Sequence, residues 1–173
     1  AKTWPVPPDP DGTGDAIEGR VAGALYDLFD NTNDGWDQVS FGFSPIWNIL
    51  RTGTRETNFS EFWSSWRSQG YGQHLAVQAI YQNTIDYDTA PAVAGLPDIA
   101  LLQDTSRNNA MDLWTYASDA ESSDAELAYT VAAVSDLRCG VTIDALSFVD
   151  IAPQAGWWGS CTVTIRVSDG IKV

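Results

Sequence analysis

Basic residues and histidine are scarce in this chain of 173 residues. It has nine lysines and arginines against 23 acidic residues, for a net charge of −14, and a single histidine. A surface with so few cations is unsuited to the phosphates of nucleic acid or an anionic membrane. No run of about 18 apolar residues occurs, as a transmembrane helix would need. We therefore expect neither a nucleic-acid partner nor membrane insertion.

The single histidine, His74, also excludes common catalytic sites. A zinc peptidase needs two histidines one helical turn apart and a third ligand, and no HExxH motif is present. A Ser-His-Asp set lacks a nucleophile motif, and no glycine-rich phosphate loop follows a strand. We expect no catalytic residues, no enzyme activity and no bound zinc in this chain.

The first half has apolar residues at helical spacing. The chain is 44% apolar with eight tryptophans, enough for packed cores. Asp15 and Glu18 have the spacing of a capping box, Pro45 suits a first helical turn, and Asn58 or Thr57 suits an N-cap. These signals predict four short helices, which begin near residues 15, 44, 58 and 73.

The second half alternates apolar and polar residues, which is typical of short strands. We expect strands at 111–116, 127–134, 141–143, 148–151 and 161–167. Their spacing and turns predict an immunoglobulin-like β-sandwich. The last strand signal ends in a turn at residues 168–170, so we expect an incomplete edge that would accept a partner strand.

The predicted fold class is α+β, with the helices before the strands. We expect an extended proline-rich arm at 1–14, a helical domain at 15–88, a linker at 89–99 and the sandwich at 100–173. Prolines fix extended geometry in the arm, and the linker is recognised from its composition.

Residues 30–37 are the first candidate metal site. Asp30, Asp34 and Asp37 supply oxygen ligands around Gly35, as Ca²⁺ prefers. The glutamate that completes an EF-hand loop is absent, because Phe41 occupies its place. The alternative is a polar loop whose Asp and Asn side chains cap backbone groups.

Two further sites concern covalent modification. Cys139 and Cys161 are the only cysteines, and a disulfide between them suits an exported protein; the alternative is two free thiols. Asn58 begins an N-glycosylation sequon, for which the alternative is a helix cap.

Both halves resemble known families. Residues 18–28 (EGRVAGALYDL), 62–66 (FWSSW) and 79–83 (AIYQN) resemble the C-terminal region of secreted, gluzincin-like zinc metallopeptidases, without the HExxH part. Residues 112–116, 119–122 and 167–170 look like a cadherin-like or dystroglycan-type immunoglobulin-fold module. That second resemblance implies a Ca²⁺ site at one end of the sandwich, with Asp98, Asp119 and Glu121 as ligands.

The function that we expect is structural. The open edge predicts a secreted or cell-surface adhesive subunit that assembles with itself, into a filament, or with another surface protein. The alternative is the non-catalytic C-terminal fragment of a secreted zinc metallopeptidase. The tryptophan content suggests a third hypothesis, a carbohydrate-binding module.

Overall fold

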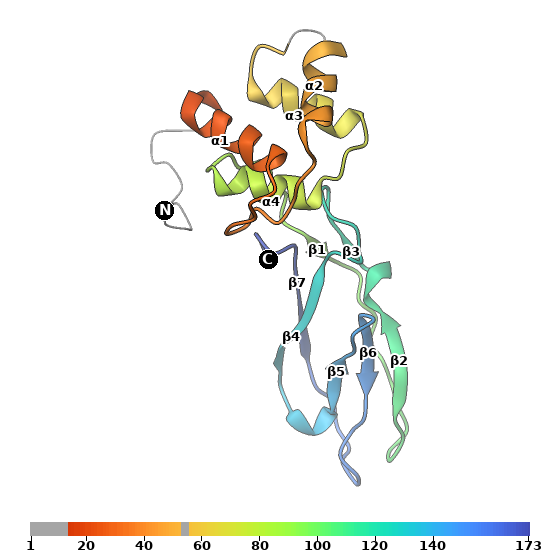
Figure 1. Ribbon diagram of the computed structural model, residues 1–173. Helices are drawn as coiled ribbons and strands as arrows, with labels where there is room; N and C mark the ends of the chain where they lie inside the picture. Colours follow the sequence, from red (N-terminus) through yellow and green to blue (C-terminus); the bar gives the residue numbers. More distant parts are fainter. Residues whose placement is uncertain (1–13, 53–55) are drawn as a thin grey trace. The chain divides into compact units, whose positions relative to one another are not determined.

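The computed structural model describes residues 14–52 and 56–173, which form an α+β fold (Figure 1). The chain divides into two compact units, one up to Asp88 and one from Thr89 to Val173. Apart from Gly14, the expected proline-rich arm lies outside the described residues. In the described parts, no helix has the length and apolar character that crossing a membrane requires.

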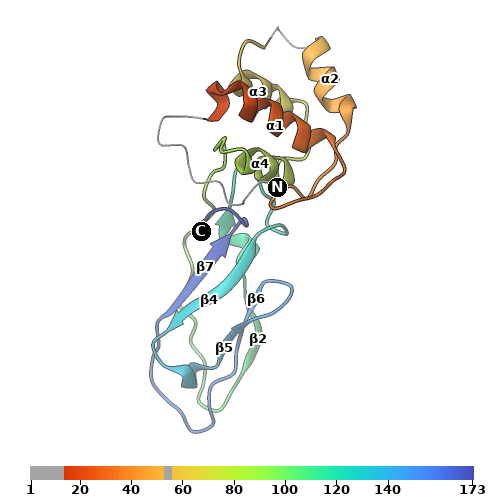
Figure 2. The same ribbon diagram turned by 60° about the vertical axis from the view of Figure 1, so that its left-hand side comes forward.

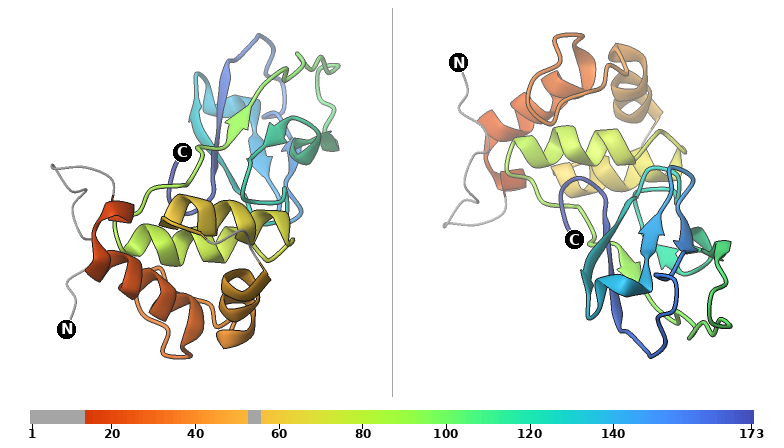
Figure 3. Two further views of the ribbon diagram at one scale, coloured as in Figure 1. Left: turned by 90° about the horizontal axis from the view of Figure 1, so that it is seen from above. Right: turned by 90° about the horizontal axis from the view of Figure 1, so that it is seen from below.

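The first unit is helical. Its elements are a 3-10 turn, η1 (Gly14–Ala16), and the helices α1 (Glu18–Phe29), α2 (Phe43–Thr52), α3 (Phe59–Ser68) and α4 (His74–Gln82). Helix α1 packs against α4, and α2 packs against α3 (Figures 2 and 3). The core combines aliphatic residues of α1, α2 and α4 with the aromatic face of α3. Its buried members include Leu28, Ile46, Ile49, Phe62, Trp63, Trp66, Val77 and Ile80.

Local signals explain where these helices begin and end. The side chain of Asn58 accepts a hydrogen bond from the Glu61 amide at 2.9 Å and caps α3. Gly70, with φ of 72°, allows the chain to turn after that helix. The expected capping box at Asp15 is wrong. Asp15 lies in η1, where its carboxylate accepts a hydrogen bond from the Tyr87 hydroxyl, and α1 begins three residues later without a side-chain cap.

The second unit contains seven strands in three small antiparallel sheets. They are β1 (Ala92–Val93), β2 (Arg107–Asp112), β3 (Ala117–Ser118), β4 (Ala128–Val134), β5 (Val141–Ile143), β6 (Phe148–Ile151) and β7 (Val163–Ser168). The sheet orders are β2-β6-β5, β4-β7 and β1-β3. The expected strand at 111–116 is shifted, because β2 begins at Arg107 and residues 113–115 form a 3-10 turn.

Strand β7 shows clear alternation between its two faces. Val163, Ile165 and Val167 are at least half-buried, whereas Thr164 and Arg166 are exposed. Among the described strands, β7 pairs only with β4, so its other edge has no strand partner. Beyond it the chain turns at Asp169, whose carboxylate accepts hydrogen bonds from the amides of Ile171 and Lys172.

Candidate functional site

A buried polar network centres on Gln82, at the end of α4. Its side chain is fully buried. The carbonyl oxygen Oε1 accepts from the amides of Trp36 and Asp37 at 2.7 and 3.1 Å. The amide nitrogen Nε2 donates to Asp34 at 2.8 Å and to Asp27 at 3.3 Å. One side chain thus fixes the 34–37 turn against the helices, across more than 40 residues of sequence.

The neighbouring Asn83 and Asp37 complete this network. Asn83 donates to Asp27 at 2.6 Å and to the carbonyl oxygen of Ala79 at 3.1 Å. Asp37 is 1% exposed, and its carboxylate accepts a long hydrogen bond, 3.4 Å, from the Val39 amide. Burial, together with the nearby carboxylates, raises the pKa of Asp37 to about 6.

The same network contains two of the three candidate calcium ligands in the 30–37 loop. Asp34 and Asp37 are held together by Gln82 and by the hydrogen bond from the Asp37 amide to the Asp34 carbonyl oxygen. Asp30 follows α1 as its C-cap. In the described ranges, no group of three acidic, histidine or cysteine side chains has the geometry to hold a metal. Calcium at this loop stays a prediction.

The second set of calcium candidates lies in the β unit. Asp119 accepts hydrogen bonds from the amides of Glu121 and Ser122, at 2.9 and 2.6 Å. Glu121 is buried and accepts from the amide of Thr89 at 3.1 Å. Asp98 is exposed in the segment between β1 and β2. The carboxylates of Asp119 and Glu121 therefore support the backbone of turns, and calcium there also remains a prediction.

A row of exposed aromatic side chains crosses the surface of α1 and α2. Tyr26 meets Phe29 edge-on, Phe29 meets Phe43 edge-on, and Phe43 stacks on Trp47, with ring centroids 5.8–6.3 Å apart. Their exposed fractions run from 43% to 59%, and Leu50 beside them is 53% exposed. We call these four aromatic residues the aromatic row. Phe29 and Trp47 follow the helical spacing of the apolar residues, and yet they face outward.

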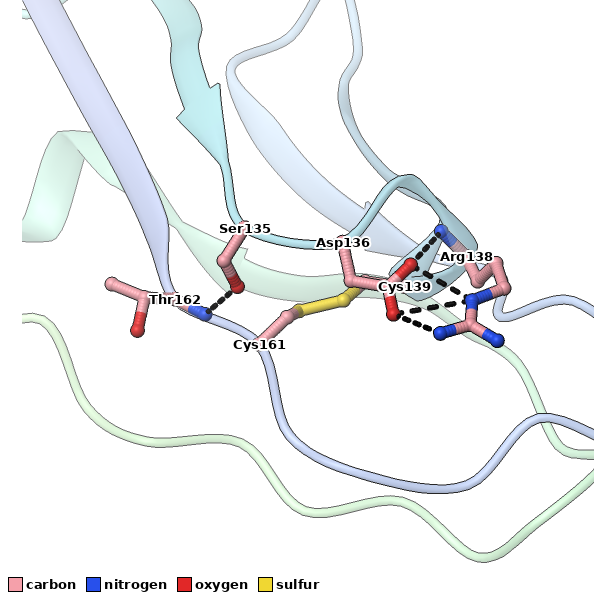
Figure 4. The surroundings of a disulfide bond; sticks show 6 residues. All are labelled: Ser135, Asp136, Arg138, Cys139, Cys161 and Thr162. Carbon is pink, nitrogen blue, oxygen red and sulfur yellow. Dashed lines mark hydrogen bonds and ion pairs between the residues drawn. A yellow bond between two sulfur atoms is a disulfide. The ribbon is translucent and has the colours of Figure 1, made fainter.

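The two cysteines form a disulfide in the β unit (Figure 4). Cys139 lies in the short turn η3 (Leu137–Cys139), and Cys161 comes just before β7. Ser135 reinforces the junction, since its amide donates to the carbonyl oxygen of Thr162 and its hydroxyl accepts from the Thr162 amide. Next to it, Arg138 donates to Asp136 and lowers the pKa of that carboxyl to about 2.

A cavity of about 720 Å³ lies beside the disulfide, inside the β unit. Side chains of β2, β5, β6 and β7 line it, together with the segments 96–104 and 157–162. Trp157 and Trp158 both line the cavity, and Trp158 is 82% exposed. Alternation in the sequence indicated the inward positions, but it gave no sign that the interior would remain open.

The first half of the chain is similar to part of a known peptidase. Residues 2–84 match the family model of the Mycolysin C-terminal domain. No curated protein and no solved structure gives a match. The family match supports the resemblance of the helical half to the C-terminal region of a mycolysin-like metallopeptidase. It ends before the β unit, whose resemblance to cadherin-like modules stays a prediction.

Proposed function

We propose that this chain is the non-catalytic C-terminal part of a secreted zinc metallopeptidase. The observation that carries the proposal is the match of residues 2–84 to the Mycolysin C-terminal domain. The chain has one histidine and no HExxH motif, so the zinc ligands would come from a different part of the enzyme. Its own task is then to support the catalytic part.

The aromatic row is the surface that would make this contact. Contiguous exposed apolar patches are uncommon on independent soluble proteins and mark interaction surfaces. Aromatic residues are enriched in the buried centre of such interfaces. The row contains four touching rings and lies in the half that matches the peptidase family. We therefore assign it to the contact with the catalytic part.

The test compares the isolated chain with the product of the complete reading frame. In both, Phe43 and Trp47 are replaced by serine, and Trp158→Ser serves as a matched control in the β unit. Because the row is exposed here, the double variant should unfold at the same temperature as the parent chain. In the complete enzyme it should lower the melting temperature and the rate of casein hydrolysis, whereas the control should change neither.

Two results would count against the proposal. If the complete reading frame contains no HExxH motif, the chain is not part of a zinc metallopeptidase of this kind. A double variant that behaves like the parent in the complete enzyme would remove the role of the aromatic row.

The other expected functions have less support. Self-assembly into a filament requires copies that each carry a net charge of −14 to associate, and the family match favours the peptidase fragment. Sedimentation of the purified chain at high concentration tests it. A carbohydrate-binding role now depends on the exposed Trp158 and the aromatic row, and a glycan array tests it. Location outside the cell follows from the peptidase proposal.

A further inference from the structure

The interior of the β unit is open where a sandwich is normally closed. Residues that point into it, such as Met111, Ile151 and Ile165, are only half-buried. The cavity of about 720 Å³ has the size of a ligand site, and its walls are mainly apolar side chains. An apolar interior of this size gains stability when an apolar group fills it.

Two segments that line this cavity have unpaired backbone groups. Strand β7 pairs only with β4 among the described strands, although the two-residue strand β1 also lies in contact with it. None of the backbone amides of segment 96–103 donates a hydrogen bond to another backbone group of the described residues. A free acyl chain would use the apolar walls and leave these donors and acceptors unused, whereas an extended peptide would use both. The site therefore favours a polypeptide.

We propose that an extended polypeptide segment with apolar side chains at alternate positions adds as a strand to β7 and fills the cavity. A strand as long as β7, six residues, directs three side chains into the cavity, because successive side chains alternate. The proposal concerns the β unit and does not depend on the peptidase assignment.

The charged residues around the cavity indicate which charge the added segment should carry. Among the described residues, Asp98 and Asp104 are the only charged ones that line the cavity. Asp104 already accepts a hydrogen bond from the Gly156 amide at 2.6 Å, and Asp98 is exposed. A second copy would bring another 14 negative charges to this acidic surface. The segment that fits best carries lysine or arginine beside its apolar positions.

The probe is a fluorescein-labelled peptide that alternates valine and threonine between terminal lysines. We expect saturable binding to the intact chain by fluorescence anisotropy. A matched peptide with N-methyl groups on alternate amides keeps the side chains and loses the strand donors. It should bind at least tenfold more weakly, because it can no longer donate two or three of the strand hydrogen bonds.

Two variants of β7 locate the site. Ile165→Glu places a charge in the cavity and should reduce peptide affinity at least tenfold. Thr164→Glu makes the same change on the exposed face and should leave affinity within twofold. Because Ile165→Glu could unfold the unit, hydrogen exchange of the unmodified chain gives a second measurement. Bound peptide should slow exchange of β7 and 96–103 amides.

Several outcomes overturn the proposal. They are equal affinity of the two peptides, no saturable binding at millimolar peptide, and protection that omits β7. Binding of dodecanoate in place of the peptide would assign the cavity to an acyl chain. Self-association of the chain that the peptide does not reverse would assign it to a second copy.

Discussion

Replacement of Gln82 by glutamate tests the buried network of the helical unit with almost no change in shape. The new side chain keeps an oxygen for the amides of Trp36 and Asp37. It replaces the nitrogen that donates to Asp34 at 2.8 Å and to Asp27 at 3.3 Å with a second oxygen. As a carboxylate it would face two other carboxylates in a fully buried position.

The expected loss of stability can be worked out by assuming that the new glutamate is protonated, so that it carries no charge in this buried position. Protonation restores one donor, and holding a glutamate of ordinary pKa neutral at pH 7 costs about 3.7 kcal/mol. The second donor bond, to Asp27, is lost in either case and contributes about 1 kcal/mol. We therefore expect Gln82→Glu to lose between 4 and 5 kcal/mol, roughly, at pH 7 and about 2 kcal/mol at pH 5.

Urea unfolding measures these differences. Circular dichroism at 222 nm follows the helices, and the wild type is measured at each pH so that its own titration cancels. Gln38→Glu is the control, because Gln38 is exposed in the same loop and its side chain donates to the Gly35 carbonyl oxygen of that loop. It should stay within about 0.5 kcal/mol of the wild type. A Gln82→Glu loss below about 1 kcal/mol at pH 7, or one of equal size at both pH values, would refute the reasoning.

Three further predictions concern Asp37, the turn at Gly140 and the disulfide. The pKa of Asp37 is raised to about 6, so the folded unit holds this proton more tightly than the unfolded chain. Its stability should therefore fall as pH rises from about 4 to about 6, and Asp37→Asn should flatten that part of a melting-temperature profile. Gly140 has φ of 61°, and a Cβ there would overlap a backbone carbonyl oxygen, so Gly140→Ala should destabilise the β unit by more than about 2 kcal/mol in urea. Gly156→Ala, where the space is open, should cost about 1 kcal/mol or less. Replacement of Cys139 and Cys161 by serine opens a loop with a sequence separation of 22 and should cost about 3 kcal/mol, with an unchanged variant contradicting the assigned disulfide.

The sequence predicts the helices well where local signals agree. For α3, the cap at Asn58, the aromatic spacing and Gly70 all mark the same boundaries, and the structure follows them. For α1, the pattern at Asp15 has a capping spacing, but a long-range hydrogen bond to Tyr87 takes the carboxylate away. Tertiary contacts of this kind leave no periodic signal in the sequence.

The candidate sites are harder to predict for the same reason. The network at Gln82 joins residues more than 40 positions apart, and nothing around Gln82 distinguishes it from an exposed helical glutamine. The aromatic row arises because Phe29 and Trp47 lie at the margins of apolar stripes, where spacing does not decide between core and surface. The cysteine pairing was predictable, since two cysteines allow one intramolecular disulfide.

The disulfide also determines how the β unit would carry mechanical tension. A pull on Val173 passes along β7 to Cys161 and crosses the covalent bond directly to Cys139. The strands β5 and β6, which lie between the two cysteines, are then bypassed by the load. When both are fully stretched, the oxidised chain is shorter than the reduced chain by roughly 70 Å, which is the extended length of the segment between the two cysteines. Oxidation thus limits how far this part of the chain can be extended.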